Sequence, residues 1–380
     1  MYIRIGMNIP SGKSIQNIIA GWCFSFLLLT PAILPGQQDS LPKGLALSGF
    51  LETYYAWENK SISTNGSWPS HLVSHYRNQE FALNLALLQA AWNKPGLRAR
   101  FGIMAGNYPM ANLAGEPVGL RNLYEASVAL RLSPRRHWWA EVGLFPSHIG
   151  FETPIGADNL NLSRSIVADN SPYYEQGVKL TWQNPDKKWV LSLLALNGWQ
   201  KMVKDNPQPA LEGGGHQVTY APGKGWLINS SSYVGLAPRP VSGNSTATWA
   251  REERVYHNLY VQWHGSGRWQ LISGVDYGIH RITGTGWRSF YAPVVISRYA
   301  FRENMRVAVR AEGYHDPSQI VWVNPSGTRI VSFSANWDYE YQRGILFRLE
   351  YRPFLYAQSH YRPESILTRN RLTFSFCCRL

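Results

Sequence analysis

Charged residues of both signs gather in one long polar stretch, residues 147–172. Glu152, Asp158, Arg164 and Asp169 are spread through it among Gly, Asn and Ser. Loops of this length usually carry a function. If the stretch folded into a lumen and these charges faced one another, they would set a transverse electric field on passing ions. If it stayed outside, it would be a plain surface loop, and the sequence leaves both interpretations open.

A second set of charges lies in segments where every second residue is apolar, which is the period of a β-strand with one apolar face. In 305–312, for example, Val307 and Val309 alternate with Arg306 and Arg310. The same parity turns eight bases away from the apolar face: Arg98, Arg100, Arg131, Lys179, Arg306, Arg310, Arg348 and Arg352. It also turns six acids that way: Glu125, Glu141, Asp276, Glu312, Asp338 and Glu350. Bases that face water in a lumen favour anions, whereas bases paired with acids across strands form a solvated wall.

The common signatures of catalysis and cofactor binding are missing from the sequence. The Gly-rich segment GGGHQ is neither G-x-G-x-x-G nor a P-loop, and no G-x-S-x-G or H-E-x-x-H occurs. Neighbouring Cys377 and Cys378 point to opposite faces of a strand and cannot form a metal site by themselves. We predict no catalytic residue, no cofactor and no metal, so the chain is not expected to be an enzyme. The remaining enzymatic alternative is a membrane-embedded lipase with Ser and His on neighbouring strands.

The elements that must position the charges are sixteen predicted strands, most of about ten residues or more, which is enough to cross a bilayer at a tilt. They lie at 45–57, 78–89, 95–106, 121–132, 136–147, 173–184, 187–199, 214–222, 225–237, 252–265, 267–282, 290–302, 304–314, 327–341, 343–353 and 367–380. The pair 214–222 and 225–237 is the weakest, because runs of Gly and Ser blur its alternation. Without that pair the count falls to 14.

The links between these strands alternate between short and long. SPRR, NPDK, PGKG and YQRG are short, whereas others, such as APRPVSGNSTATWAREE, are long and polar. This alternation puts all short turns at one end, which in outer-membrane barrels is the periplasmic end. The predicted fold class is all-β: a closed antiparallel transmembrane β-barrel of about 16 strands, with short periplasmic turns and long outer loops.

The composition also favours a membrane barrel over a soluble enzyme. Charged residues make up only 16% of the chain, whereas aromatic residues make up 13%, and many exposed aromatics need an interfacial solvent. Five Trp residues lie on apolar faces within a few residues of a short turn, as in an aromatic girdle. They are Trp138, Trp182, Trp189, Trp263 and Trp269.

The first residues have the features of a secretory signal peptide. An apolar run at 18–34 follows Arg4 and Lys13 and precedes the polar QQDS. We predict a signal peptide at 1–36 and the barrel at 37–380; the alternative is a retained N-terminal membrane anchor. Loss of two bases lowers the formal net charge from +13 to +11. An exported chain without a run of Lys or Arg is not expected to bind nucleic acid.

At 144–199 the sequence resembles the β-barrel porins of the OmpL-like type. The matching pieces are GLFPSHIGFETPIG, NLSRS, SPYYEQGVKLTW and LNGW, while 49–57 and 81–90 are similar to that family's first two strands. The resemblance implies an outer-membrane channel and leaves the solute open. One departure is the C-terminal strand, whose last aromatic, Phe376, precedes the final residue, whereas such barrels often end on an aromatic.

We therefore expect an outer-membrane porin that lets small hydrophilic solutes diffuse passively through a water-filled lumen, with a bias toward anions. Its expected partners are the lipid bilayer of the outer membrane, small hydrophilic solutes or ions, and other copies of the chain in a homo-oligomer. The alternative is an outer-membrane barrel that acts as a surface adhesin or structural anchor. A wide, empty lumen would favour the porin, and a lumen plugged by side chains or by residues 147–172 would favour the anchor.

Overall fold

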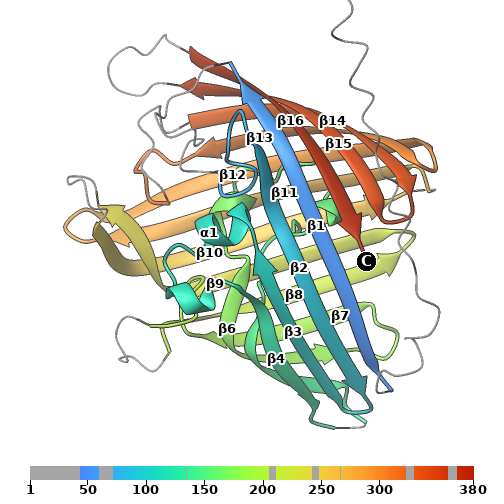
Figure 1. Cartoon of the computed structure of the whole chain (residues 1–380). Helices are drawn as coiled ribbons and strands as arrows, with labels where there is room; N and C mark the ends of the chain where they lie inside the picture. Colours follow the sequence, from blue (N-terminus) through green and yellow to red (C-terminus); the bar gives the residue numbers. More distant parts are fainter. Residues whose placement is uncertain are drawn as a thin grey trace, which may run out of the picture. The chain divides into compact units, whose positions relative to one another are not determined.

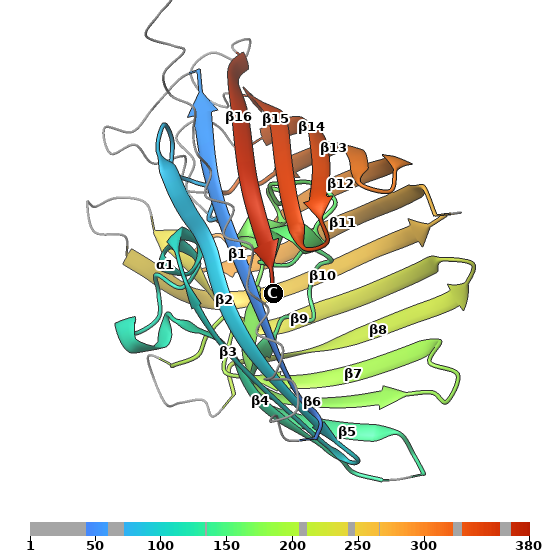
Figure 2. The same ribbon diagram turned by 45° about the vertical axis from the view of Figure 1, so that its right-hand side comes forward.

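The computed structural model describes residues 43–59, 72–133, 135–204, 211–241, 248–265, 267–321, 329–357 and 366–380. The predicted signal peptide, 1–36, lies outside these residues. The described chain forms a closed barrel in which sixteen antiparallel strands follow one another in sequence order and β1 pairs with β16 (Figures 1 and 2). The predicted fold class and the count of sixteen are confirmed.

The strands are β1 (Leu45–Glu58), β2 (Phe81–Lys94), β3 (Leu97–Ala105), β4 (Leu123–Arg131), β5 (Trp138–Pro146), β6 (Tyr174–Gln183), β7 (Trp189–Leu196), β8 (Gly213–Gly223), β9 (Trp226–Val241), β10 (Thr248–His264), β11 (Trp269–Ile282), β12 (Gly286–Arg302), β13 (Met305–His315), β14 (Arg329–Gln342), β15 (Ile345–Ala357) and β16 (Ile366–Arg379). The doubtful pair of the sequence is therefore present as β8 and β9, and the count does not fall to 14. Short helices occur only in connections among the described residues: α1 (Asn107–Asn112) and the 3-10 turns Val118–Leu120, Gly156–Asp158 and Ala168–Asn170. None of the helices in the described residues is long and apolar enough to cross a membrane.

The two faces of the wall follow the alternation of the sequence. On β13, Val309 is 56% exposed on the outward face, whereas its neighbour Arg310 is 2% exposed on the inward face. Residues paired across strands share a face, so Ala335 on β14 lies outward beside Val309. Apolar side chains on the outward face suit lipid, because hydrocarbon has no groups that could solvate a charge.

All the links that the sequence predicts to be short fall at one end of the barrel. At the β8–β9 turn Gly225 has a φ of +80°, and a Cβ there would collide with the carbonyl oxygen of His264 on β10. Glycine is required at this turn because it has no side chain to clash and tolerates positive φ. The turn therefore joins β8 to β9 and also contacts β10, where His264 N donates to the carbonyl oxygen of Gly225 at 2.8 Å.

The other end differs from the prediction in two places. The β9–β10 and β11–β12 connections were expected to be long, but these strands continue pairing as far as Val241 with Thr248 and Ile282 with Gly286. Alternating, β-branched and aromatic sequence extends beyond the predicted strand ends, so hydrogen bonding between strands absorbs most of both predicted loops. The long connections that remain are gathered elsewhere, including 106–122, 147–173 and 197–212.

Aromatic residues gather near the short-turn end of the outward face. Trp138 pairs in register with Trp182, and Trp189 stacks on Tyr220 at 4.1 Å between ring centroids. Trp226 adds to the five predicted Trp residues, since its ring centroid lies 5.9 Å from that of Trp263. An aromatic belt at this height is the expected anchor at a membrane interface.

These two faces yield a stability prediction. Val309→Arg should lower the free energy of unfolding in lipid vesicles by about 2–4 kcal/mol, because it places a charge in the apolar band. Thr181→Arg is the control, since Thr181 lies half-buried on the inward face and its new charge would meet water. Urea unfolding followed by Trp fluorescence measures both, and equal losses would contradict the assignment of faces.

Candidate functional site

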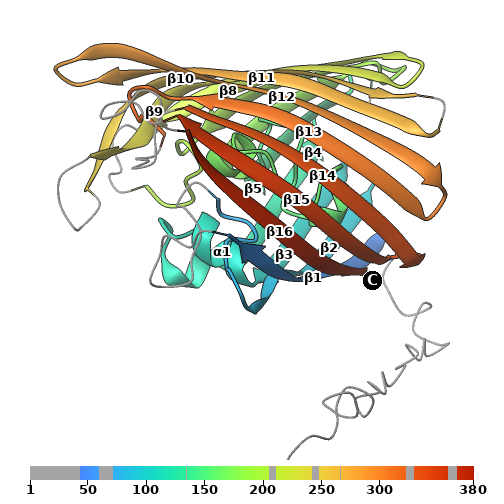
Figure 3. The same ribbon diagram turned by 90° about the horizontal axis from the view of Figure 1, so that it is seen from above.

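The connection between β5 and β6, residues 147–173, lies inside the barrel. Figure 3 shows the green segments within the ring of strands. Its backbone is bound to the inward faces of β14 and β15: Leu162 N donates to Asn336 Oδ1 at 3.0 Å, and Ser163 N donates to Glu350 Oε2 at 3.0 Å. Of the two interpretations that the sequence left open, the structure has the inward one. We call residues 147–173 the inner loop.

Arg348 on β15 holds the first half of the inner loop. Its guanidinium donates to three loop carbonyl oxygens, those of Gly156 at 2.7 Å, Asn159 at 3.2 Å and Leu160 at 3.1 Å. The same group donates through Nε to Asp338 Oδ1 on β14 at 2.8 Å. Arg suits this position because its planar group carries five donors in a fixed arrangement.

Arg310 and Arg352 hold the second half. Arg310 donates to the carbonyl oxygen of Ser163 at 2.6 Å, and its Nε lies 3.1 Å from Glu312 Oε1. Arg352 donates to Glu312 Oε1 at 2.6 Å and to the carbonyl oxygen of Arg164 at 3.0 Å. Breaking one member of such a buried set would leave an uncompensated charge, which costs about 3–5 kcal/mol.

This placement changes the meaning of three predicted pore bases. Arg310, Arg348 and Arg352 lie on the inward face, as their parity predicts, but each is at most 2% exposed. Their charges are matched by carboxylates and by loop carbonyl groups rather than by water. The expectation that these three side chains present their charges to a water-filled lumen is therefore wrong, because the inner loop covers them.

The charges of the inner loop itself pair locally. Glu152 accepts from Ser165 N at 3.0 Å and lies 3.8 Å from Arg310 Nη1. Asp158 accepts from Arg379 on β16 at 2.7 Å, and this pair is exposed. These acids and bases therefore neutralise one another in contact pairs, and they do not face one another across an open passage.

Arg164 and Asp169 form the buried pair of the inner loop. Arg164 Nε lies 3.0 Å from Asp169 Oδ1. The Arg164 guanidinium also packs against the rings of Tyr108 and Tyr173, at 4.6 and 4.3 Å from their centroids. Asp169 Oδ2 accepts from Val73 N at 3.2 Å, so this pair joins the inner loop to the chain that enters β2 and to α1. Cation–π contacts stabilise such a desolvated guanidinium.

His148 ties the start of the inner loop to two strands. Its Nδ1 lies 2.8 Å from Glu175 Oε2 on β6, and its Nε2 lies 2.7 Å from the carbonyl oxygen of Ser232 on β9. Burial lowers the pKa of His148, but the Glu175 carboxylate and the Ser232 carbonyl outweigh burial and the nearby Lys179, so the pKa is raised. Both partners can only accept, which favours the doubly protonated ring.

The raised pKa of His148 gives a pH prediction. Its imidazolium stabilises the fold fully below the unfolded pKa of about 6.5, and this contribution disappears as pH rises through the higher folded pKa. As the pH rises above about 6.5, the parent should therefore lose more stability in urea unfolding than His148→Gln does. Parallel profiles for the two proteins would show that His148 is neutral in the fold.

The other five predicted bases lie on the inward face in the half of the barrel near the short turns. Arg98 is exposed and stacks on Trp139 at 3.8 Å, and Arg100 donates to Asn93 Oδ1 at 3.1 Å. Lys179 pairs with Glu141 at 2.7 Å, and Arg306 pairs with Glu340 at 2.6 Å. Arg131 is half-buried with Nη2 3.3 Å from His137 Nδ1. These groups border the part of the lumen that the inner loop leaves accessible.

The half of the lumen near the long connections is filled instead. Inward-facing aromatic side chains from β9 to β15 pack into one buried cluster with Ile149, Ile166 and Val167 of the inner loop. They are Tyr233, Tyr256, Phe290, Tyr314, Phe354 and Tyr356. This cluster was not predicted, because the inward face of such a barrel was expected to be polar. Aromatic residues at the same parity as Arg254 and Arg352 were the available signal.

Two cavities lie on opposite sides of the inner loop. One, of about 470 Å³, is near the long connections and is lined by Asp169 and Asn170 of the loop, with Glu116 and Arg254. The other, of about 570 Å³, is at the short-turn end and is lined by Ala157 of the loop, with Arg306 and Arg379. We call these two cavities the mouths of the barrel, and the inner loop separates one from the other.

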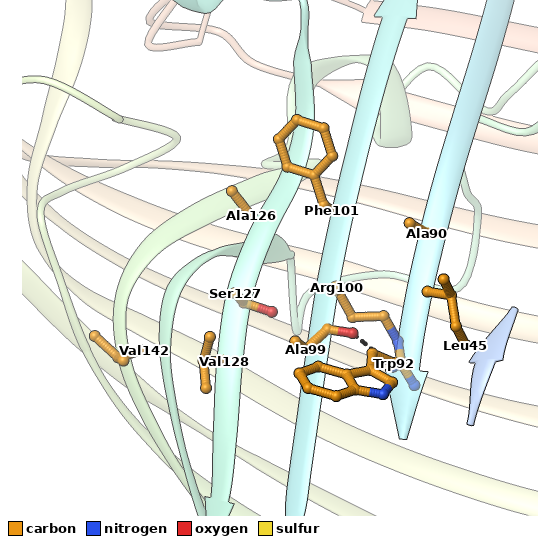
Figure 4. A pocket seen from close by; sticks show the side chains of 10 residues that line it. All are labelled: Leu45, Ala90, Trp92, Ala99, Arg100, Phe101, Ala126, Ser127, Val128 and Val142. Atoms are coloured by element: carbon orange, nitrogen blue, oxygen red, sulfur yellow. Dashed lines mark hydrogen bonds between the residues drawn. The ribbon is translucent and has the colours of Figure 1, made fainter. Parts of the chain in front are cut away.

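A third depression lies on the outward wall and is not a site of the same kind. Figure 4 shows it across β1 to β5, lined by Leu45, Ala90, Trp92, Ala99, Arg100, Phe101, Ala126, Ser127, Val128 and Val142. Paired residues such as Ala99 with Val128 share the outward face, whereas Arg100 belongs to the inward one. This groove is part of the lipid-facing surface.

Several solved structures of outer-membrane proteins have a similar fold. The outer membrane channel DcaP of Acinetobacter baumannii superposes with a TM-score of 0.59 at 11% identity, covering 88% of this chain and 97% of that one. The anion-selective porin from Comamonas acidovorans gives 0.56 at 9%, covering 88% and 99%. The trimer form of OmpT from Vibrio cholerae gives 0.55 at 9%, also covering 88% and 99%. No curated protein matches the chain by sequence.

The closed sixteen-stranded barrel with an apolar outward face defines an integral protein of the outer membrane. The family model described as "Putative beta-barrel porin-2, OmpL-like" matches residues 44–377. The chain belongs to this porin family, as the resemblance at 144–199 implied. The predicted class of protein and its location in the outer membrane are confirmed.

Proposed function

We propose that this porin conducts small hydrophilic solutes by passive diffusion and that the inner loop is its barrier. The observation that carries this is the position of the inner loop between the two mouth cavities, bound to the wall by Arg310, Arg348 and Arg352. A solute that crosses the barrel must pass this loop. Sieving then depends on how tightly the anchors hold it.

Loosening one anchor should widen the passage. In Asp338→Asn with Arg348→Met the loop loses its bonds at Gly156, Asn159 and Leu160, and no buried carboxylate is left unpaired. The unitary conductance in planar bilayers should rise severalfold over the parent. Arg98→Met is the control, because Arg98 is a lumen base that contacts Trp139 and not the inner loop.

The half of the lumen near the long connections is filled by side chains. This observation favours the second candidate function, a surface adhesin or structural anchor. The same recordings distinguish the two. A parent and a double variant that both fail to conduct, although both barrels are folded, would support the anchor. Conductance in the parent that increases in the double variant supports the porin with the inner loop as its barrier.

We propose that the pore prefers anions and that only the accessible bases cause this preference. Arg98 and Arg100 lie on the inward face near the short-turn mouth, where low-dielectric walls focus their field. Under a KCl gradient the parent should have a reversal potential whose sign indicates a preference for anions. Arg98→Gln should bring this potential closer to zero. Arg281→Gln is the matched control, since Arg281 is exposed and pairs with Glu253 on the outward side. The difference should fade near 1 M salt, where the screening length is about 3 Å. Cation preference in the parent would exclude the bias.

A further inference from the structure

Arg254 on β10 is a buried arginine whose contacts are all with neutral groups. It is 2% exposed. Its Nε donates to His280 Nδ1 at 3.1 Å, and its Nη2 donates to the carbonyl oxygen of Pro238 at 3.2 Å. The guanidinium also lies over the ring of Trp199, at 4.7 Å from the ring centroid. Among the described residues, no acid forms an ion pair with Arg254.

The similarly buried Arg348 shows what Arg254 lacks. Arg348 Nε donates directly to Asp338 Oδ1 at 2.8 Å. Arg254 is connected to an acid only through His280, whose Nε2 lies 3.2 Å from Glu252 Oε2. A charge that is taken out of water without a partner of opposite sign is costly. The guanidinium of Arg254 is therefore suited to a ligand that brings a negative group.

Glu116, in the connection 106–122, is the opposite case, a buried carboxylate without a basic partner. It is 4% exposed. Its Oε1 accepts from Tyr174 OH at 3.0 Å and from Met202 N at 2.8 Å, and its Oε2 accepts from Val203 N at 3.3 Å. All three donors are neutral. A carboxylate has about four acceptor positions, so Glu116 can still accept from a positive group.

These two charges line the same cavity, the mouth of about 470 Å³ near the long connections. They form no ion pair with each other, so each is open to a ligand. Cavities of about 300–1,000 Å³ are the usual size for small-molecule sites. Trp199, Leu236 and Val321 add apolar surface to the lining.

The other charged residues of this lining have interactions of their own. Asp169 pairs with Arg164 at 3.0 Å, and Lys201 and Glu212 each have a partner as well. The unmatched charges of the cavity are thus one base and one acid. A simple anion would compensate only the base, and a simple cation would compensate only the acid.

We propose that this mouth binds a zwitterion of the size of a dipeptide, with its carboxylate on Arg254 and its ammonium group on Glu116. A guanidinium binds a carboxylate through parallel N–H donors, and such charge-assisted bonds are stronger than neutral ones. One ligand without net charge then supplies both missing partners. Its side chains would lie against Trp199, Leu236 and Val321.

This inference rests on the proposed function and names a solute class for it. Long connections face outward in outer-membrane barrels, so a solute from outside meets this cavity before the inner loop. Asp169 and Asn170 of the inner loop belong to the lining. A bound zwitterion therefore lies directly against the barrier.

The test is isothermal titration calorimetry on the full barrel in detergent. The probe is L-alanyl-L-alanine, which should bind saturably. Its N-acetyl form lacks the ammonium group and its C-terminal amide lacks the carboxylate, so each should bind about tenfold more weakly or worse, a loss of about 1.4 kcal/mol. Absence of dipeptide binding, or full affinity of either analogue, overturns the proposal.

Two variants assign the contacts. In Arg254→Gln the preference for the dipeptide over its amide should disappear, and in Glu116→Gln the preference over the N-acetyl form should disappear. Glu253→Gln is the matched control, because Glu253 is exposed and lies outside the cavity; it should keep both preferences. Preferences that persist in the first two variants overturn the assignment. If a variant does not fold, the analogues on the parent decide.

Calorimetry does not depend on conduction, so the two proposals fail separately. A parent that conducts in planar bilayers but does not bind the dipeptide contradicts the zwitterion site alone. A parent that binds the dipeptide but does not conduct contradicts the proposed function and leaves the site in place.

Discussion

The position of the inner loop depends on one buried network of charge. Arg310, Arg348 and Arg352 are removed from water, and each is compensated partly by carboxylates of the wall and partly by carbonyl oxygens of the loop. Without the loop these guanidinium groups would face water, whereas a loop in this position without the guanidinium groups would leave buried carbonyl groups unsatisfied. The loop therefore depends on the wall for its hydrogen bonds, which explains why a connection with little regular structure holds a defined position.

The network also divides the lumen into two unlike halves. Near the long connections the inner loop packs its apolar residues against an aromatic cluster, so that part resembles the core of a soluble domain. Near the short turns the wall carries Arg98 against the Trp139 ring, and Lys179 and Arg306 with acidic partners, and water reaches several of these groups. A barrel of this width would otherwise contain a broad aqueous channel. The inner loop converts it into two mouths separated by a barrier.

The outward wall faces lipid instead of water, so the choice of its residues is simpler. Paired residues such as Val309 and Ala335 present apolar groups, and aromatic residues mark the interface. His216, Ser232 and His257 depart from this choice on three neighbouring strands and lie side by side in register. Lipid offers them no hydrogen-bond partner, and Ser232 Oγ lies 2.6 Å from His216 Nδ1 instead.

The sequence by itself determined the wall. A period of two residues, the short turns and the Trp positions are local features, and they fixed the number of strands, the two faces and the inward parity of Arg310 and Arg348. They missed the extensions of β9, β10 and β12, because pairing with a neighbouring strand carries each of them past the residue at which its own sequence predicted an end. Only the tertiary structure decided where the inner loop lies and which bases meet water. Arg348 meets Gly156 and Arg379 meets Asp158 across almost two hundred residues or more of chain. Such partners are chosen by the closure of the barrel, which no local pattern records.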